Sequence, residues 1–180
     1  MRILKESAIG LVIDIQERLY PHMDQHELLL KNTGILLSGL KALDIPVLLT
    51  EQYPKGLGTT LDEIKLKLSD IDPLEKISFS CCDDSSYMEA LAASGKTQII
   101  ICGIETHVCV MQTVIDLLEK DFIPVVIANC VSSRSPTDKH IALERMRQEG
   151  AIISTYESIL FELERVAGTD TFKTISKLVK

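Results

Sequence analysis

The sequence predicts an α/β protein, a three-layer αβα sandwich around a six-stranded, mostly parallel sheet in the Rossmann-like order 3-2-1-4-5-6. Short β-branched runs alternate with stretches in which apolar residues recur at helical spacing, the pattern of βαβ units. The runs are largely apolar, as parallel strands buried on both faces are. A length of 180 residues corresponds to about one domain. No linker or repeat divides the chain, so residues 1–180 are expected to form a single domain.

Six runs are expected to be the strands, because each contains Val, Ile or Leu and is separated from the next by a stretch in which apolar residues recur at helical spacing. The run that ends at Asp14 and the isoleucine run that ends at Gly103 are the clearest, and the run around Lys76 is the shortest. In chain order the expected strands are Ile9–Asp14, Pro46–Thr50, Leu74–Ile77, Gln98–Gly103, Pro124–Ala128 and Ala151–Thr155.

Helices are expected between these strands, where apolar residues keep helical spacing and belong mostly to the core. Four of these helices show one apolar face each. In chain order the residues that mark them are Leu29, Leu36, Leu40 and Leu43, then Leu61, Ile64 and Leu68, then Met88 and Leu91, and finally Ile141 and Met146.

The helix expected from Thr106 to about Lys120 differs from the others, because its apolar residues point in too many directions for one buried stripe. They are Val108, Val110, Met111, Val114, Ile115, Leu117 and Leu118. The sheet can cover one side of this helix. A partner subunit is the favoured cover for the other side, and a neighbouring helix of the same chain is the alternative. We therefore expect a homo-oligomer, a dimer, tetramer or larger.

Charge and hydropathy narrow the range of partners and compartments. The formal net charge of −7 has the wrong sign for binding nucleic acid or an anionic membrane surface. The apolar runs are far shorter than the roughly 18 residues of a membrane span. The N-terminal residues show no secretory signal, so a cytoplasmic location is expected. The five cysteines are odd in number and irregularly spaced, which predicts reduced thiols.

Three polar residues stand near the carboxyl ends of predicted strands, where open parallel sheets bind ligands. Asp14 ends the first strand, Lys76 lies in the third, and Cys109 follows the fourth at the start of a helix. A thiol in a first helical turn meets free N–H groups and the positive end of the helix dipole, which favour a thiolate. Each residue alone could also be structural, as a turn aspartate, an edge-strand lysine or a buried cysteine.

Together these residues and their neighbours resemble the isochorismatase-like cysteine hydrolases over essentially the whole chain. Leu11–Gln16 resembles the family's opening strand with its catalytic aspartate, and Glu75–Ser80 resembles the segment with the catalytic lysine. Gly103–Val110 resembles the nucleophile motif, which implies a non-proline cis peptide between Ile104 and Glu105. The stretch Glu51–Gly58 resembles that of a metal-free subgroup whose substrate is not known.

The residue types, read with this resemblance, imply a cysteine hydrolase that cleaves a small carboxamide or related acyl bond through a thioester. Asp14 would take the thiol proton, Lys76 would stabilise the thiolate, and Cys109 would attack the carbonyl. The backbone N–H groups of Glu105 and Cys109 would hold the oxyanion. The candidate substrate-binding residues are Gln16, Leu19, Tyr53, Thr106 and His107.

Departures from the family pattern narrow the activity. Members that cleave a vinyl ether lack the cysteine, so Cys109 favours amide chemistry. Nicotinamidases of the family usually carry an Asp-x-His metal motif where this chain has Thr50–Tyr53, and its histidines lack ligand spacing, so we expect no metal and no cofactor. Asn129 stands where the family often has Asp. A non-catalytic interaction protein on the same fold and a metal-dependent nicotinamidase-like amidase stay as alternatives. A thiol-redox or nucleic-acid enzyme is disfavoured by the absence of CxxC spacing and by the net charge.

Overall fold

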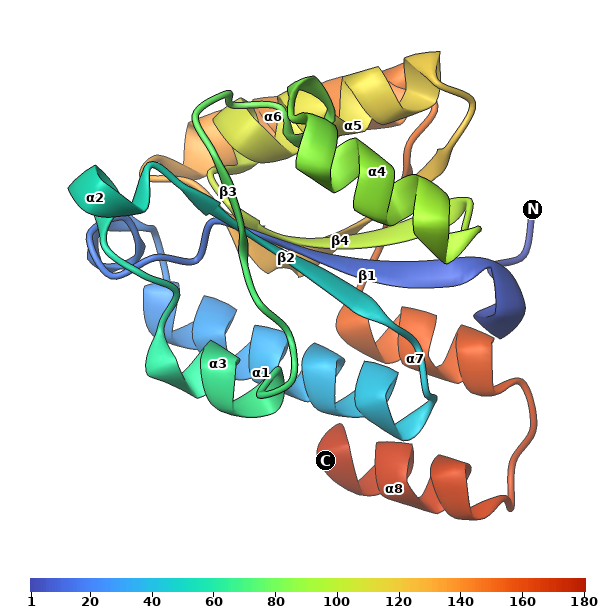
Figure 1. Ribbon diagram of the computed structural model, residues 1–180. Coiled ribbons are helices and arrows are strands. Elements are labelled where there is room, and N and C mark those ends of the chain that lie inside the picture. Colours follow the sequence, from blue (N-terminus) through green and yellow to red (C-terminus); the bar gives the residue numbers. More distant parts are fainter.

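A six-stranded sheet with all strands parallel lies between two layers of helices in the computed structural model, which describes residues 1–180 (Figure 1). The strand order is β3-β2-β1-β4-β5-β6, which confirms the predicted order. All six predicted strands are present. Their bounds are Ala8–Ile13 for β1, Val47–Gln52 for β2, Leu74–Lys76 for β3, Gln98–Ile104 for β4, Ile123–Ser132 for β5 and Ile152–Ser154 for β6.

The central strands β1 and β4 approach each other closely at the end where the polar candidates lie. Every residue of both strands is buried, and they pair in register from Ala8 opposite Gln98 to Ile13 opposite Gly103. Gly103 has a φ of 133°, and a Cβ added there would lie 2.2 Å from the carbonyl oxygen of Ile13. Only glycine fits this position. The segment after β4 is thereby held against the end of β1.

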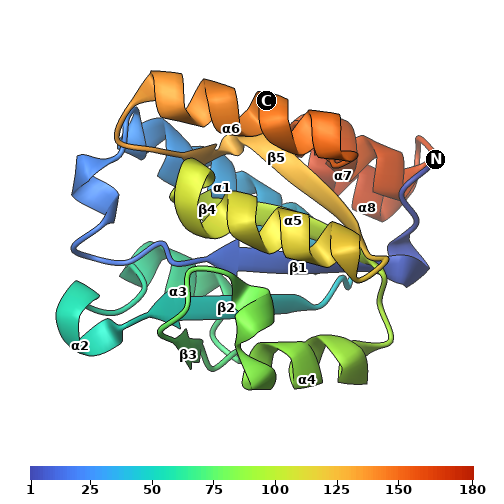
Figure 2. The same ribbon diagram turned by 90° about the horizontal axis from the view of Figure 1, so that it is seen from above.

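Two helical layers cover the sheet (Figures 1 and 2). One face carries α1 (His26–Ala42), α3 (Asp62–Lys67), α7 (Tyr156–Glu164) and α8 (Asp170–Leu178), and the other carries α4 (Ser85–Ser94), α5 (Met111–Glu119) and α6 (Pro136–Glu149). Each layer packs its apolar side chains into a separate core cluster against the sheet. None of the helices has both the length and the apolar composition that crossing a membrane requires.

The C-terminal helices α7 and α8 were not expected from the sequence. Both begin at a threonine whose hydroxyl accepts a backbone N–H of the first turn: Thr155 accepts from Ser158, and Thr169 accepts from Phe172. Helix α7 packs on α1, and a Cβ on Gly39 of α1 would come within 2.5 Å of the side chain of Leu160. These two helices complete the helical layer to which α1 belongs. The short helix α2 (Pro54–Leu57) lies within the Glu51–Gly58 stretch, where the sequence had predicted no helix.

The helix expected from Thr106 to Lys120 is split into a π-helical turn, η4 (Thr106–Val110), and α5. Helix α6 of the same chain lies beside it (Figure 2), so the same chain supplies part of its second cover. The sheet-facing residues are fully buried. Four apolar side chains stay half-buried, namely Val108, Met111, Ile115 and Leu118.

Candidate active site

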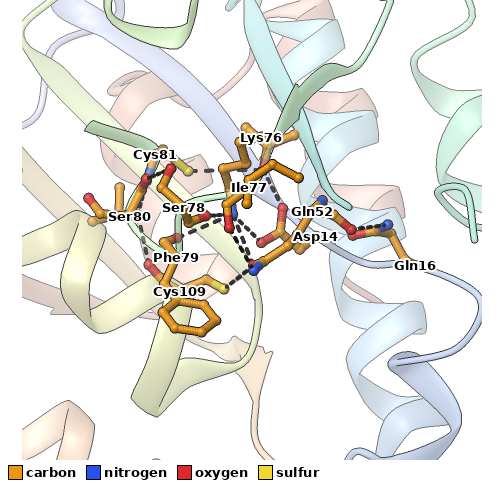
Figure 3. Close-up of polar contacts among 12 residues, drawn as sticks. Asp14, Gln16, Gln52, Lys76, Ile77, Ser78, Phe79, Ser80, Cys81 and Cys109 are labelled. Atoms are coloured by element: carbon orange, nitrogen blue, oxygen red, sulfur yellow. Dashed lines mark hydrogen bonds and ion pairs between the residues drawn. The ribbon is translucent and has the colours of Figure 1, made fainter. Parts of the chain in front are cut away.

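The polar candidates meet where four neighbouring strands end (Figure 3). Asp14 follows β1, Lys76 ends β3, and Cys109 lies in η4, directly after β4. The sheet order places β3, β2, β1 and β4 side by side, so these ends share one edge. The structure thus brings together the three residues that the sequence singled out from three separate segments.

Asp14 and Lys76 form a buried ion pair. The Lys76 Nζ lies 2.6 Å from Asp14 Oδ2, and the side chains are only 1% and 0% exposed. The Thr50 hydroxyl donates to the other carboxylate oxygen of Asp14 at 2.7 Å. Asp14 adopts a left-handed backbone conformation with a φ of 52°, which aspartate tolerates better than most residues. Both carboxylate oxygens are therefore held in place.

The ammonium group of Lys76 is surrounded by oxygen atoms. Besides Asp14, it donates to the carbonyls of Ser78 and Phe79 at 3.2 Å each and to Gln52 Oε1 at 3.4 Å. Burial is the largest single influence and lowers the pKa of Lys76, but the charge and hydrogen bond of Asp14 together with the nearby Cys81 and Cys109 sulfurs outweigh it, so the net shift is upward. Lys76 is therefore a fixed cation at neutral pH.

The Cys109 thiol lies beside these groups, in the first turn of the helix as expected. Its Sγ donates to Gln52 Oε1 at 3.0 Å, and the residue is 5% exposed. The peptide bond between Ile104 and Glu105 is cis, as the resemblance implied. Burial and the charge of Asp14 raise the pKa of Cys109 far above its ordinary value, against the opposing charge of Lys76. The resting group is therefore a thiol, whereas the helix position alone had predicted a favoured thiolate.

Gln52 is the site residue that sequence reasoning missed. Its Oε1 accepts from both Cys109 and Lys76, and its Nε2 donates to the carbonyl of Ile77 at 3.3 Å. The second strand was expected to end at Thr50, but β2 continues to Gln52. The rule that selected Asp14, a polar side chain at a strand's carboxyl end, would have selected Gln52 once the strand end was correct.

Gln16 lies in a different place from the one expected of a substrate-binding residue. It is fully buried, and its amide donates to the carbonyls of Gln52 at 3.0 Å and Gly58 at 2.7 Å. Its Oε1 accepts the N–H of Gln52 at 2.8 Å. Both amide protons are used by the backbone, so Gln16 fixes the end of β2 and leaves no donor for a substrate.

The other substrate-binding candidates do not share one pocket. Tyr53 is 51% exposed and lines, with Lys76, a cavity of about 480 Å³. Leu19 lines a different cavity of about 410 Å³, together with Glu105. The half-buried His107 bonds through Nδ1 to the hydroxyl of Ser133 at 2.9 Å. The hydroxyl of Thr106 is buried without a hydrogen-bond partner. The cavity at Leu19 and Glu105 borders the turn that carries the thiol.

Two further observations concern metals and the other thiols. No group of three or more His, Cys, Asp or Glu side chains is arranged to hold a metal ion. All five cysteines are free and buried. Cys81 and Cys82 lie in the 3₁₀ turn η3 (Cys81–Asp83), and burial raises the pKa of each to about 12. Cys81 lies within 4.0 Å of the Thr50 hydroxyl, which makes it a neighbour of the site.

Comparison with known proteins identifies close relatives. The family model described as "Isochorismatase domain" matches residues 8–158. Isochorismatase domain-containing protein 2A of mouse is 38% identical over 179 residues, which cover 99% of this chain and 85% of that protein. The solved structure of MAR1 ribonuclease from Caenorhabditis elegans has a TM-score of 0.94 at 35% identity and covers 99% of this chain and 92% of its own. The Escherichia coli YcaC gene product, described as an octameric hydrolase of unknown specificity, has a TM-score of 0.94 at 26% identity, with coverages of 99% and 89%.

Proposed function

The chain belongs to the isochorismatase family, and on that premise we propose that it is a cysteine hydrolase that cleaves a small carboxamide or related acyl bond through a thioester. One observation carries the proposal: a continuous set of contacts links the carboxylate of Asp14, the ammonium of Lys76, the amide of Gln52 and the thiol of Cys109. It supplies a base, a cation and a nucleophile within one buried cluster.

Acylation begins from the protonated thiol. Because the pKa of Cys109 is strongly raised, the thiol needs a base, and Asp14 takes the proton as the sulfur attacks the carbonyl carbon. Lys76 stabilises the negative charge that develops on sulfur. The oxyanion is held by the backbone N–H groups of Glu105 and Cys109. Asp14 then protonates the leaving nitrogen, the C–N bond breaks, and the amine departs with the thioester left on Cys109.

Deacylation uses the same base. Asp14 takes a proton from water as the water oxygen attacks the thioester carbonyl. The C–S bond breaks, the carboxylic acid leaves, and Asp14 returns the proton to the Cys109 sulfur. In this scheme the hydrogen bond from the thiol to Gln52 holds the sulfur beside Lys76 between turnovers. Among the substrate-binding candidates, Leu19 shares a cavity with Glu105, whose backbone N–H is one of the two oxyanion donors of this scheme.

The test is a screen of small carboxamides for ammonia release. Wild-type protein should release ammonia from some of them, and Cys109→Ala should release none. Mass spectrometry during turnover should find the acyl group on Cys109. Turnover that persists in Cys109→Ala would refute the proposal. If no carboxamide is cleaved and the thiol is inert to alkylating agents, the non-catalytic alternative on the same fold gains support.

Two other activities serve as comparison assays. A metal-dependent amidase of the nicotinamidase type would lose activity in chelator. The name of the C. elegans neighbour suggests an RNA cleavage assay. We expect no cleavage of RNA, because the net charge of −7 repels a polyanion and because a soft thiol prefers a carbonyl carbon.

A homo-oligomer is part of the same proposal. The half-buried side chains of Val108, Met111 and Ile115 lie in the turn that carries Cys109 and in the helix that continues from it. Burying these side chains in a partner contact would stabilise both the assembly and the nucleophile turn. The octameric state of the E. coli neighbour supports this view.

A further inference from the structure

We infer that Thr113 is a positioning residue that sets the Lys76 ammonium against the Cys109 thiol, an inference that rests on the function proposed for those two groups. Thr113 lies on α5 one turn after Cys109 and is fully buried. Its hydroxyl donates to the carbonyl of Cys109 at 2.7 Å and accepts the N–H of Cys81 at 2.9 Å. One hydroxyl group thus touches both the nucleophile turn and the segment that follows the lysine.

The segment that Thr113 holds also forms part of the Lys76 site. It runs from Ser78 to Cys82, and its carbonyls at Ser78 and Phe79 accept from the Lys76 Nζ. A second contact fastens the same segment to α5, since Ser80 donates its hydroxyl to the carboxylate of Asp116. The same Ser80 oxygen accepts the N–H of Cys82 at 3.2 Å. We call the contacts at Thr113 and Asp116 the latch.

The latch matters because Lys76 ends β3 whereas Cys109 lies in η4 after β4, and the two side chains make no direct hydrogen bond. Gln52 bridges them, but its Oε1 accepts from the Lys76 Nζ only at 3.4 Å. The charge of Lys76 is what lowers the pKa of Cys109 against burial and Asp14, so the thiolate fraction depends on how far the ammonium lies from the sulfur. Fixing the carbonyls that hold the ammonium to the helix of Cys109 fixes that separation.

The experiment measures alkylation of Cys109 by iodoacetamide, followed by mass spectrometry, over about pH 6 to pH 9. This probe needs no knowledge of the substrate. Thr113→Val keeps the volume and removes the hydroxyl, and we expect it to slow alkylation about tenfold at each pH, as a rise of one pKa unit would. Thr113→Ser keeps the hydroxyl and should react at nearly the wild-type rate. Thr33→Val is the matched control, because Thr33 is equally buried in α1 on the opposite face of the sheet.

A merely structural role predicts the opposite sign. Loosened packing would expose the thiol, which is now 5% exposed, and would speed alkylation. An unchanged or faster rate in Thr113→Val therefore overturns the inference. Ser80→Ala opens the second latch contact and should slow alkylation by a smaller factor, which keeps the test decisive if the valine variant does not fold. A Cys109 that is alkylated at the same rate in wild type and in both variants defeats the latch alone, whereas carboxamide turnover that persists in Cys109→Ala defeats the proposed function together with it.

Discussion

Replacing Lys76 by methionine tests the buried ion pair without any assumption about the substrate. Methionine has a similar length and fills the space of the lysine stem, so the change removes mainly the charge. The carboxylate of Asp14 then keeps one hydrogen-bond donor, the Thr50 hydroxyl, and loses the Lys76 ammonium 2.6 Å away. The carbonyls of Ser78 and Phe79 lose their donor as well.

The expected loss of stability is large. Because the side chains of Lys76 and Asp14 are 1% and 0% exposed, water cannot replace the missing partner. Breaking a buried pair from one side costs about 3–5 kcal/mol. For a chain of this size each kcal/mol lowers the Tm by about 2–4 °C, so Tm should fall by roughly 6–20 °C. Lys76→Met combined with Asp14→Asn should recover part of this loss, since no uncompensated charge stays buried.

The pH dependence has a definite sign. The folded-state pKa of Lys76 is raised, so its contribution is fully present below the unfolded value of about 10.4 and is lost as pH rises through the folded pKa. The stability difference between wild type and Lys76→Met should therefore be constant near neutral pH and should narrow in the alkaline range. Urea titrations at a series of pH values measure it.

Lys173→Met is the control for the loss of a surface ion pair. Lys173 lies 2.9 Å from Asp170, but these side chains are 62% and 99% exposed, so the change should have little effect. If Lys76→Met is no more destabilising than Lys173→Met, the buried pair does not have the energetic role that its geometry indicates.

The remaining predictions concern catalysis and assembly. Asp14→Asn should abolish ammonia release yet leave Cys109 open to alkylation, because the Asp14 charge raises the pKa of the thiol. The ammonia assay measures the first effect and mass spectrometry of alkylated Cys109 the second. Parallel loss of ammonia release and alkylation would argue against Asp14 as the base. Activity should persist in chelator, and one tightly bound zinc or iron per chain in elemental analysis would favour the metal-dependent amidase instead. Light scattering should give a mass well above the 20.0 kDa of one chain, and a fully active 20.0 kDa species would contradict the oligomer.

The fold could be predicted from the sequence because its strongest signal is local. The strands β1 and β4 are buried at every position, so both appear in the sequence as nearly continuous apolar runs that can be recognised without knowledge of their neighbours. The length of β5 could not be predicted in the same way. It extends to Ser132 because its pairing with β4 shifts register between Ile101 and Gly103 and then resumes, which is a property of two strands together. The missed helix α7 has a weaker signal, a capping threonine and a short apolar stripe.

In the site, too, single residues could be identified from the sequence, whereas roles that depend on contacts between distant segments could not. Asp14, Lys76 and Cys109 could be identified because each stands near a strand end, and the motifs around them resemble a known family. The roles of Gln16 and Gln52 could not, because both glutamines look alike in the sequence. Only the tertiary contacts show that one donates to backbone carbonyls and the other accepts from a thiol and an ammonium.

The acidity of Cys109 shows why local reasoning can give the wrong sign. A helix N-terminus favours a thiolate, but it acts with partial charges of about half a unit. The burial of the sulfur and, after it, the full charge of Asp14 oppose it, and the full charge of Lys76 only partly offsets them. The balance depends on three segments that meet only after folding. A raised pKa is also consistent with the proposed chemistry, because Asp14 takes the proton of the resting thiol when a carbonyl is in place.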